Sequence, residues 1–176
     1  MTSLSDIHVL VVDDNQQMRF LLRCLLRAAG VVRVTETATA AAAFDTLGVS
    51  TVDLVILDWK MAPIDGLEFA RMVRCDRNSP NPFVPILMLT AHTEISRVAA
   101  ARDAGVSGFI KKPISTRLLF DRISSALTDT RNFIRSDDFF GPDRRHGQLT
   151  NYAGPYRRAG DPGLAAGDTF DIEDAC

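Results

Sequence analysis

At 176 residues, the chain is long enough for one domain with a sizeable core and for a further segment beside it. A hydrophobic content of 46%, a charged content of 24% and a formal charge of −2 exclude a strongly basic protein, so we expect no direct DNA binding. No apolar run approaches the roughly 20 residues of a membrane span, and the start MTSLSDIHVL lacks a signal-peptide pattern, so we expect a cytoplasmic protein with no membrane partner.

Apolar runs alternate with helical patterns over most of the chain. The first run, HVLVV, is continuous, which is typical of a strand covered on both faces of a parallel sheet. In chain order, the patterns predict a strand over 8–12, a helix over 16–29, a strand over 31–35, a helix over 39–47, a strand over 53–57, a helix over 67–73, a strand over 83–89, a helix over 94–104, a strand over 108–111 and a helix over 116–127. This strict alternation predicts a doubly wound α/β domain, with helices on both faces of a parallel sheet.

Polar side chains follow four of the five predicted strands. Asp13 and Asp14 follow the first strand, and Asp58 follows the third. Thr90 ends the fourth run, and Lys112 ends the fifth. Because the carboxyl ends of parallel strands lie at one edge of an open sheet, where ligands bind, these groups should meet in one shallow site. Any one of them could merely end a strand or cap a helix, but the four strand ends together favour a site.

The chemistry of such a site follows from its charges. Three crowded carboxylates repel one another and stay ionised only if a cation offsets them. Hard oxygen ligands in an incomplete cage suit Mg²⁺, which keeps several of its waters. A carboxylate beside Mg²⁺, with a hydroxyl and an ammonium group opposite, meets the needs of phosphoryl transfer. The product would be an acyl phosphate, whose lability to water suits a signal.

The ordered motifs VVDDNQQMR, LVILDWKMAPIDG, ILMLTA and GFIKKP resemble those of the receiver domain of bacterial two-component response regulators, especially the single-domain chemotaxis type. The resemblance covers roughly residues 6–128 and places the receiver domain within residues 1–128. It implies a flavodoxin-like sheet of five parallel strands in the order 2-1-3-4-5, with five helices.

The resemblance also implies a phosphoacceptor and a metal site. Asp58 would be the phosphoacceptor and would contribute to a Mg²⁺ site. Asp14 would bind the metal directly, and Asp13 would hold it through water. The backbone carbonyl of Lys60 would complete the protein ligands.

The resemblance implies a switch at the ends of the last two strands. Thr90 would bind the phosphoryl group and move toward it, and Phe109 would turn inward as Thr90 moves. Lys112 would pair with the phosphate, and the bond between Lys112 and Pro113 is commonly cis in the family.

Two further positions could tune the lifetime of the acyl phosphate. Lys60 and His92 lie two residues beyond Asp58 and Thr90, where side chains of the family flank the path of attacking water. Both could instead be exposed loop residues without a role. In the family, a proline commonly follows the methionine of the acceptor loop directly. Here Ala62 stands between Met61 and Pro63, so the proline comes one residue later.

Residues 129–176 differ in composition and carry no periodic apolar pattern, so an irregular tail is expected. FFGPDRRHG at 139–147 and YAGPYRRAG at 152–160 share the pattern aromatic-x-Gly-Pro-x-Arg-Arg. The tail could be a non-functional extension, could dock an acidic or phosphorylated partner, or could fold back onto the receiver. RNA binding is the weaker option because acidic residues outnumber arginines in the tail. Under the docking hypothesis, deletion after Thr128 leaves phosphorylation intact and changes partner binding.

The resemblance implies a single-domain regulator phosphorylated by a histidine kinase or a phosphotransfer protein. It would catalyse no reaction beyond its own phosphorylation and dephosphorylation. Its output would pass to a downstream protein through the face formed by the fourth helix, fifth strand and fifth helix, or through the tail. A phosphate shuttle or sink, or a scaffold that is never phosphorylated, are the alternatives. A phosphohydrolase would carry an acid at Lys60, and a flavin carrier would need a Gly-rich loop in place of DDNQQ.

Overall fold

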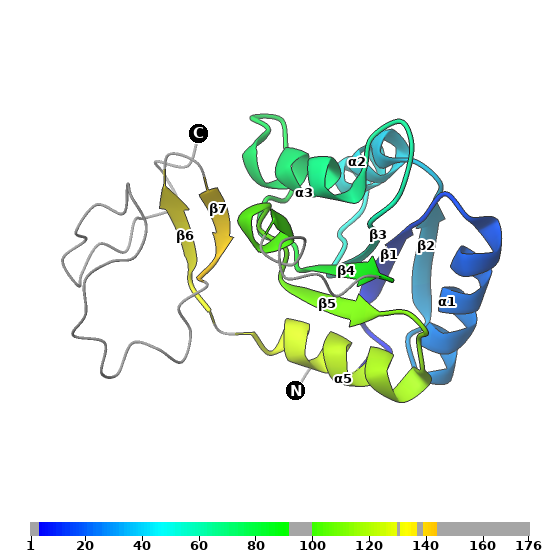
Figure 1. Cartoon of the computed structure of the whole chain (residues 1–176). Coiled ribbons are helices and arrows are strands. Elements are labelled where there is room, and N and C mark those ends of the chain that lie inside the picture. Colours follow the sequence, from blue (N-terminus) through cyan, green and yellow to red (C-terminus); the bar gives the residue numbers. More distant parts are fainter. Residues whose placement is uncertain (1–3, 92–99, 130, 137–138, 144–176) are drawn as a thin grey trace.

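The computed structural model describes residues 4–91, 100–129, 131–136 and 139–143. Five parallel strands form one sheet in the order β2-β1-β3-β4-β5 (Figure 1). The strands are β1 (His8–Val12), β2 (Arg33–Thr37), β3 (Leu54–Asp58), β4 (Ile86–Thr90) and β5 (Gly108–Lys111). The expected strand order and the doubly wound architecture are therefore confirmed.

Helices cover both faces of this sheet. They are α1 (Gln16–Ala28), α2 (Ala40–Val49), α3 (Gly66–Cys75) and α5 (Thr116–Leu127). The fourth helix expected over 94–104 lies partly outside the described residues, and residues 100–103 of it are helical. None of the helices in the described ranges is both long and apolar enough to cross a membrane.

The alternation of side chains along β1 shows how the sheet separates two cores. Val9 and Val11 pack with residues of α1 and α5, whereas Leu10 and Val12 pack with residues of α2 and α3. Every residue of β1 and β3 is buried. Burial on both faces explains why these strands are continuous apolar runs in the sequence.

Several element boundaries differ from those expected. β2 begins at Arg33 and not at Val31, because Val31 packs into the core before the strand and Val32 is exposed. β4 begins at Ile86, three residues after the predicted start at Phe83, which lies in a turn. α2 continues through Gly48, where an added Cβ would meet only the Pro80 side chain at 3.7 Å, so this glycine marks no sharp stop.

Residues 133–136 and 139–142, within the segment expected to be irregular, are strands. They form an antiparallel hairpin of β6 (Phe133–Ser136) and β7 (Phe139–Pro142). The FFGP of the first repeat is strand β7, and Phe139 is buried. The second repeat, at 152–160, lies outside the described residues.

Candidate functional site

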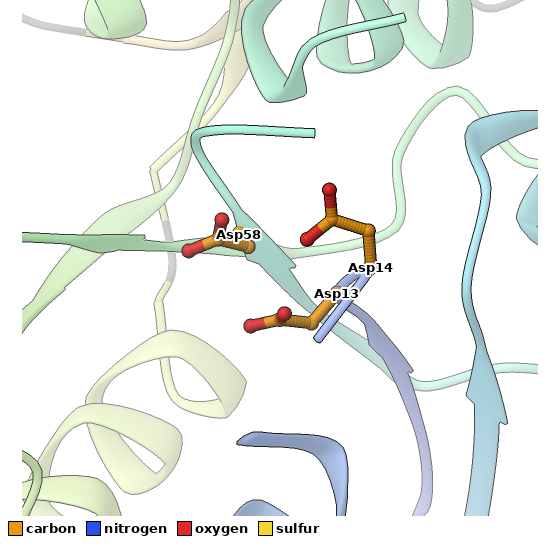
Figure 2. A group of neighbouring side chains, drawn as sticks. All are labelled: Asp13, Asp14 and Asp58. Atoms are coloured by element: carbon orange, nitrogen blue, oxygen red, sulfur yellow. The ribbon is translucent and has the colours of Figure 1, made fainter. Parts of the chain in front are cut away.

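Three carboxylates gather at the carboxyl ends of β1 and β3. Asp13 and Asp14 follow β1, and Asp58 ends β3, which pairs with β1 in parallel register. The side chains of all three meet at this edge of the sheet (Figure 2). Each offers a carboxylate oxygen, and these oxygens lie within 4.8 Å of one another. Asp13 and Asp58 are buried, whereas Asp14 is exposed.

Asp13 is a buried carboxylate with a hydrogen-bond donor at one of its two oxygens. Its Oδ1 accepts a hydrogen bond of 2.8 Å from the backbone N–H of Asn15. Its buried Oδ2 has no hydrogen-bond partner in the part of the chain that the structure describes, and Nζ of Lys112 is 3.9 Å away. Burial is the main cause that raises the pKa of Asp13, and the nearby charge of Asp58 adds to it. A cation at this position would satisfy the buried oxygen.

Asp58 is held by two donors. Nζ of Lys112 donates a hydrogen bond of 2.7 Å to Oδ1, and the backbone N–H of Lys60 donates one of 3.0 Å to Oδ2. The backbone N–H of Lys112 in turn bonds the carbonyl oxygen of Thr90 at 2.9 Å. The chain after β5 is therefore tied to the end of β4, and the Lys112 ammonium reaches the Asp58 carboxylate from there.

Glycine at position 66 allows α3 to begin directly beside the acceptor strand. An ideal Cβ on Gly66 would lie 2.3 Å from the carbonyl oxygen of Asp58. The N–H of Gly66 donates to the carbonyl oxygen of Trp59 at 3.0 Å, and the Asp65 side chain caps the helix by accepting from the N–H of Glu68. These two hydrogen bonds thus hold the loop between β3 and α3 in a tight turn beside the site.

An open depression adjoins the carboxylates along this loop. It is lined by Asp14, Trp59, Lys60, Met61, Ala62 and Asp65. The bonds before Pro63 and Pro113 are both cis, the second as the family resemblance implies.

The remaining predicted site residues are placed as follows. Thr90 is buried at the end of β4, beside Lys111 of β5 in the sheet register. Phe109 lies on β5, half-buried against the core on the α2 and α3 face. Lys60 is exposed. His92 lies outside the described residues.

The sequence reasoning missed Arg19, which supports the first strand end. Its Nη1 donates to the carbonyl oxygen of Asp13 at 2.7 Å, and Nε lies 3.8 Å from the Glu36 carboxylate. Asn15 caps α1 by accepting from the N–H groups of Gln17 and Met18. The Asn15 cap could have been predicted from its place before the helix, but the Arg19 contact depends on a turn geometry that the pattern does not reveal.

The arrangement has the chemistry of a divalent-cation and phosphoryl site. Carboxylate oxygens, one of them buried and unmatched, fit a hard cation such as Mg²⁺. The Lys112 ammonium beside Asp58 can neutralise negative charge on a group bonded to that carboxylate.

Several known proteins are similar to this chain over about two thirds of its length. Residues 9–124 match the family model described as the response regulator receiver domain. The chemotaxis protein CheY of Pseudomonas aeruginosa is 31% identical over 115 residues, which cover 65% of this chain and 91% of that protein.

Solved structures agree with this match. The chemotaxis protein CheY4 of Vibrio cholerae has a TM-score of 0.64 at 30% identity, covering 69% of this chain and 98% of that one. The receiver domain of the sensor histidine kinase PA1611 from Pseudomonas aeruginosa has a TM-score of 0.62 at 24% identity, covering 70% of this chain and 98% of that one. That structure was solved with a magnesium ion coordinated in the active site cleft.

Proposed function

Because the chain belongs to the response regulator receiver family, we propose that it is a phosphorylation-controlled signalling protein with Asp58 as its phosphoacceptor. The phosphoryl group would come from a histidine kinase or a histidine phosphotransfer protein in the cytoplasm. One observation carries this proposal: Nζ of Lys112 lies 2.7 Å from Asp58 Oδ1, beside the buried, unmatched oxygen of Asp13.

The reaction is an in-line displacement at phosphorus. A carboxylate oxygen of Asp58 forms a bond to phosphorus while the bond from phosphorus to the donor's imidazole nitrogen breaks, and the electron pair leaves with the nitrogen. Lys112 moves from pairing the free carboxylate to pairing the bound phosphoryl group. The N–H of Lys60 holds the second carboxylate oxygen in place during attack.

The metal would be held by the side chains of Asp13, Asp14 and Asp58 and by the backbone carbonyl of Lys60. Bound Mg²⁺ would neutralise charge on the phosphoryl oxygens and so lower the barrier to attack. The carboxylate cluster and the orphaned oxygen of Asp13 support this assignment.

The signal would leave the site through β4 and β5. Thr90 would move to bind the phosphoryl group, and Phe109 would follow it inward, which biases an existing equilibrium between two states. β4 and β5 are neighbours in the sheet, which places both residues on paired strands. Output would then pass by protein contact from the face of the fourth helix, β5 and α5.

Asp58→Asn should abolish covalent phosphorylation, because an amide cannot form the acyl phosphate. Intact-mass spectrometry after incubation with acetyl phosphate and Mg²⁺ should find one added phosphoryl group on the wild type and none on the variant. Asp45→Asn, an exposed change on α2, is the matched control and should be phosphorylated like the wild type. An adduct of equal yield on Asp58→Asn would reject Asp58 as the acceptor.

Lys60→Ala and His92→Ala should each change the half-life of the acyl phosphate several-fold, because side chains at the corresponding positions of the family flank the path of attacking water. The half-life is measured by loss of the phosphoryl mass after the donor is removed. Lys111→Ala, an exposed lysine of β5, is the control. Half-lives equal to that of the wild type in both variants would leave Lys60 and His92 as ordinary loop residues.

A further inference from the structure

The β6–β7 hairpin is fastened to the segment that leads into β5. The family match ends at residue 124, so this hairpin lies outside it. In Figure 1 the hairpin lies beside the amino ends of β4 and β5, away from the carboxyl ends of these strands. Phe83, just before β4, contacts the hairpin through the rings of Phe133 and Phe140, with centroids 5.1 and 5.3 Å away.

Two glycines bring the hairpin backbone against the connection before β5. Gly105 has a φ of 78°, which favours glycine, and a Cβ there would lie 2.5 Å from the carbonyl oxygen of Phe140. A Cβ on Gly141 would lie 2.7 Å from the Cα of Gly105. The backbone of the hairpin and that of the connection before β5 therefore touch at a point where neither segment has room for a side chain.

A buried arginine of α3, Arg74, contacts both the connection before β5 and the hairpin. Nε of Arg74 donates to the carbonyl oxygen of Gly105 at 3.0 Å, and Nη1 donates to that of Pro82 at 2.7 Å. The guanidinium carbon lies 5.3 Å from the ring centre of Phe133, a cation–π contact. Arg74 thus contacts both the connection before β5 and the hairpin that packs against it.

Burial of Arg74 opposes the docking that the aromatic rings favour. The residue is 4% exposed, and its Nη2 has no hydrogen-bond partner within the described ranges. Burial lowers the pKa of Arg74 to about 9, so the group is still charged at neutral pH. A buried charge with one unsatisfied donor makes the net free energy of docking less favourable.

The segment before the hairpin makes a second contact with the connection before β5, at Ser107, which directly precedes β5. Nη2 of Arg131 donates to the carbonyl oxygen of Ser107 at 2.9 Å. Nε of Arg131 donates to Oδ1 of Asp129 at 2.8 Å, which orients the guanidinium. Ser107 also binds β4, because its N–H donates to the carbonyl oxygen of Ile86. Only the four residues of β5 separate Ser107 from Lys112.

We propose that the β6–β7 hairpin is a strap that holds the connection before β5 in place and thereby positions Lys112 beside Asp58. The part concerning Lys112 rests on the proposed function. Docked, the strap keeps β5 in register with β4 and presents the lysine to the acceptor. Released, it leaves residues 105–107 with their bonds to the fourth helix, α3, β4 and Arg131, and without the backbone and ring contacts of the hairpin.

Gly141→Ala in the full chain tests the strap, since the added methyl group would meet the Gly105 backbone. Amide hydrogen exchange of residues 105–108 and 133–142 should accelerate about tenfold, while exchange in β1 stays as in the wild type. Gly48→Ala, whose added Cβ meets only Pro80 at 3.7 Å, is the matched control and should change neither region. Phe133→Ala, which removes a ring from the cluster, should reproduce the effect of Gly141→Ala.

A second readout separates positioning of Lys112 from mere stability. The rate of phosphorylation by acetyl phosphate should fall several-fold in both hairpin variants, whereas Mg²⁺ affinity should not weaken, because the carboxylates that would hold the metal lie at the ends of β1 and β3. Amide exchange as slow as that of the wild type in both variants would contradict the proposal that the hairpin is a strap. Faster exchange with a wild-type phosphorylation rate would overturn its link to Lys112. If the wild type itself takes no phosphoryl group, the proposed function fails, and the exchange data still decide the strap.

Discussion

Lys112→Met should slow phosphorylation by acetyl phosphate by about two to three orders of magnitude, because one preorganised charge at the transferring group is removed. Lys112 is the side chain that pairs Asp58, at 2.7 Å. The same variant should bind Mg²⁺ more tightly, since the carboxylates lose a competing cation. Rates come from the time course of the added phosphoryl mass, and affinities from Mg²⁺ titration of Trp59 fluorescence.

Lys111→Met is the matched control for this change. Lys111 is the preceding lysine on the same strand and is exposed, so its loss should leave both quantities close to those of the wild type. The opposite responses of rate and Mg²⁺ affinity distinguish a lost charge from a damaged fold, which would weaken both. Equal phosphorylation rates for Lys112→Met and Lys111→Met would contradict the role assigned to Lys112.

Gly66→Ala should reduce the free energy of unfolding by about 3 kcal/mol, because the new Cβ would overlap backbone that cannot yield. The Cβ would lie 2.3 Å from the carbonyl oxygen of Asp58 and 3.1 Å from the Cα of Trp59. Relief of this overlap requires α3 to move away from the acceptor strand, so Mg²⁺ binding should weaken as well.

The free energy of unfolding is measured by urea denaturation. Gly48→Ala makes the same chemical change inside α2. It should raise the free energy of unfolding by about 0.5–1 kcal/mol, because alanine stabilises a helix more than glycine does. A Gly66→Ala protein as stable as the wild type, with unchanged Mg²⁺ affinity, would show that the loop accommodates a side chain.

The sequence predicted most of the sheet because its central strands are buried on both faces. The bounds of β1 and β5 agree with the prediction, and those of β3 differ by one residue at each end. β2 was misplaced because it is an edge strand in which no residue is buried, so its apolar pattern is weak. The polar groups of the site could be predicted because each stands at the end of a strand.

Contacts between distant segments could not be predicted from the pattern. The hairpin docks through Phe83, Phe133 and Phe140, which are isolated aromatics in the sequence and meet only in three dimensions. Arg74 lies one residue beyond the helix predicted over 67–73, and in the structure it is buried against Phe133 of the hairpin. We therefore propose that the folded unit extends to Asp143, beyond the boundary expected at 128. A deletion that tests the tail alone should be made after Asp143.

The central claim is that Asp58 accepts a phosphoryl group with the help of Mg²⁺, and fluorescence of Trp59 tests it most directly. Trp59 is the single tryptophan, follows Asp58 in the chain and lines the depression beside the carboxylates. Wild type and Asp58→Asn would be titrated with Mg²⁺ and then with beryllofluoride. We predict a Mg²⁺-dependent response to beryllofluoride in the wild type that is absent from Asp58→Asn. No response to Mg²⁺ or to beryllofluoride in the wild type, with no phosphate adduct by mass spectrometry, would contradict it.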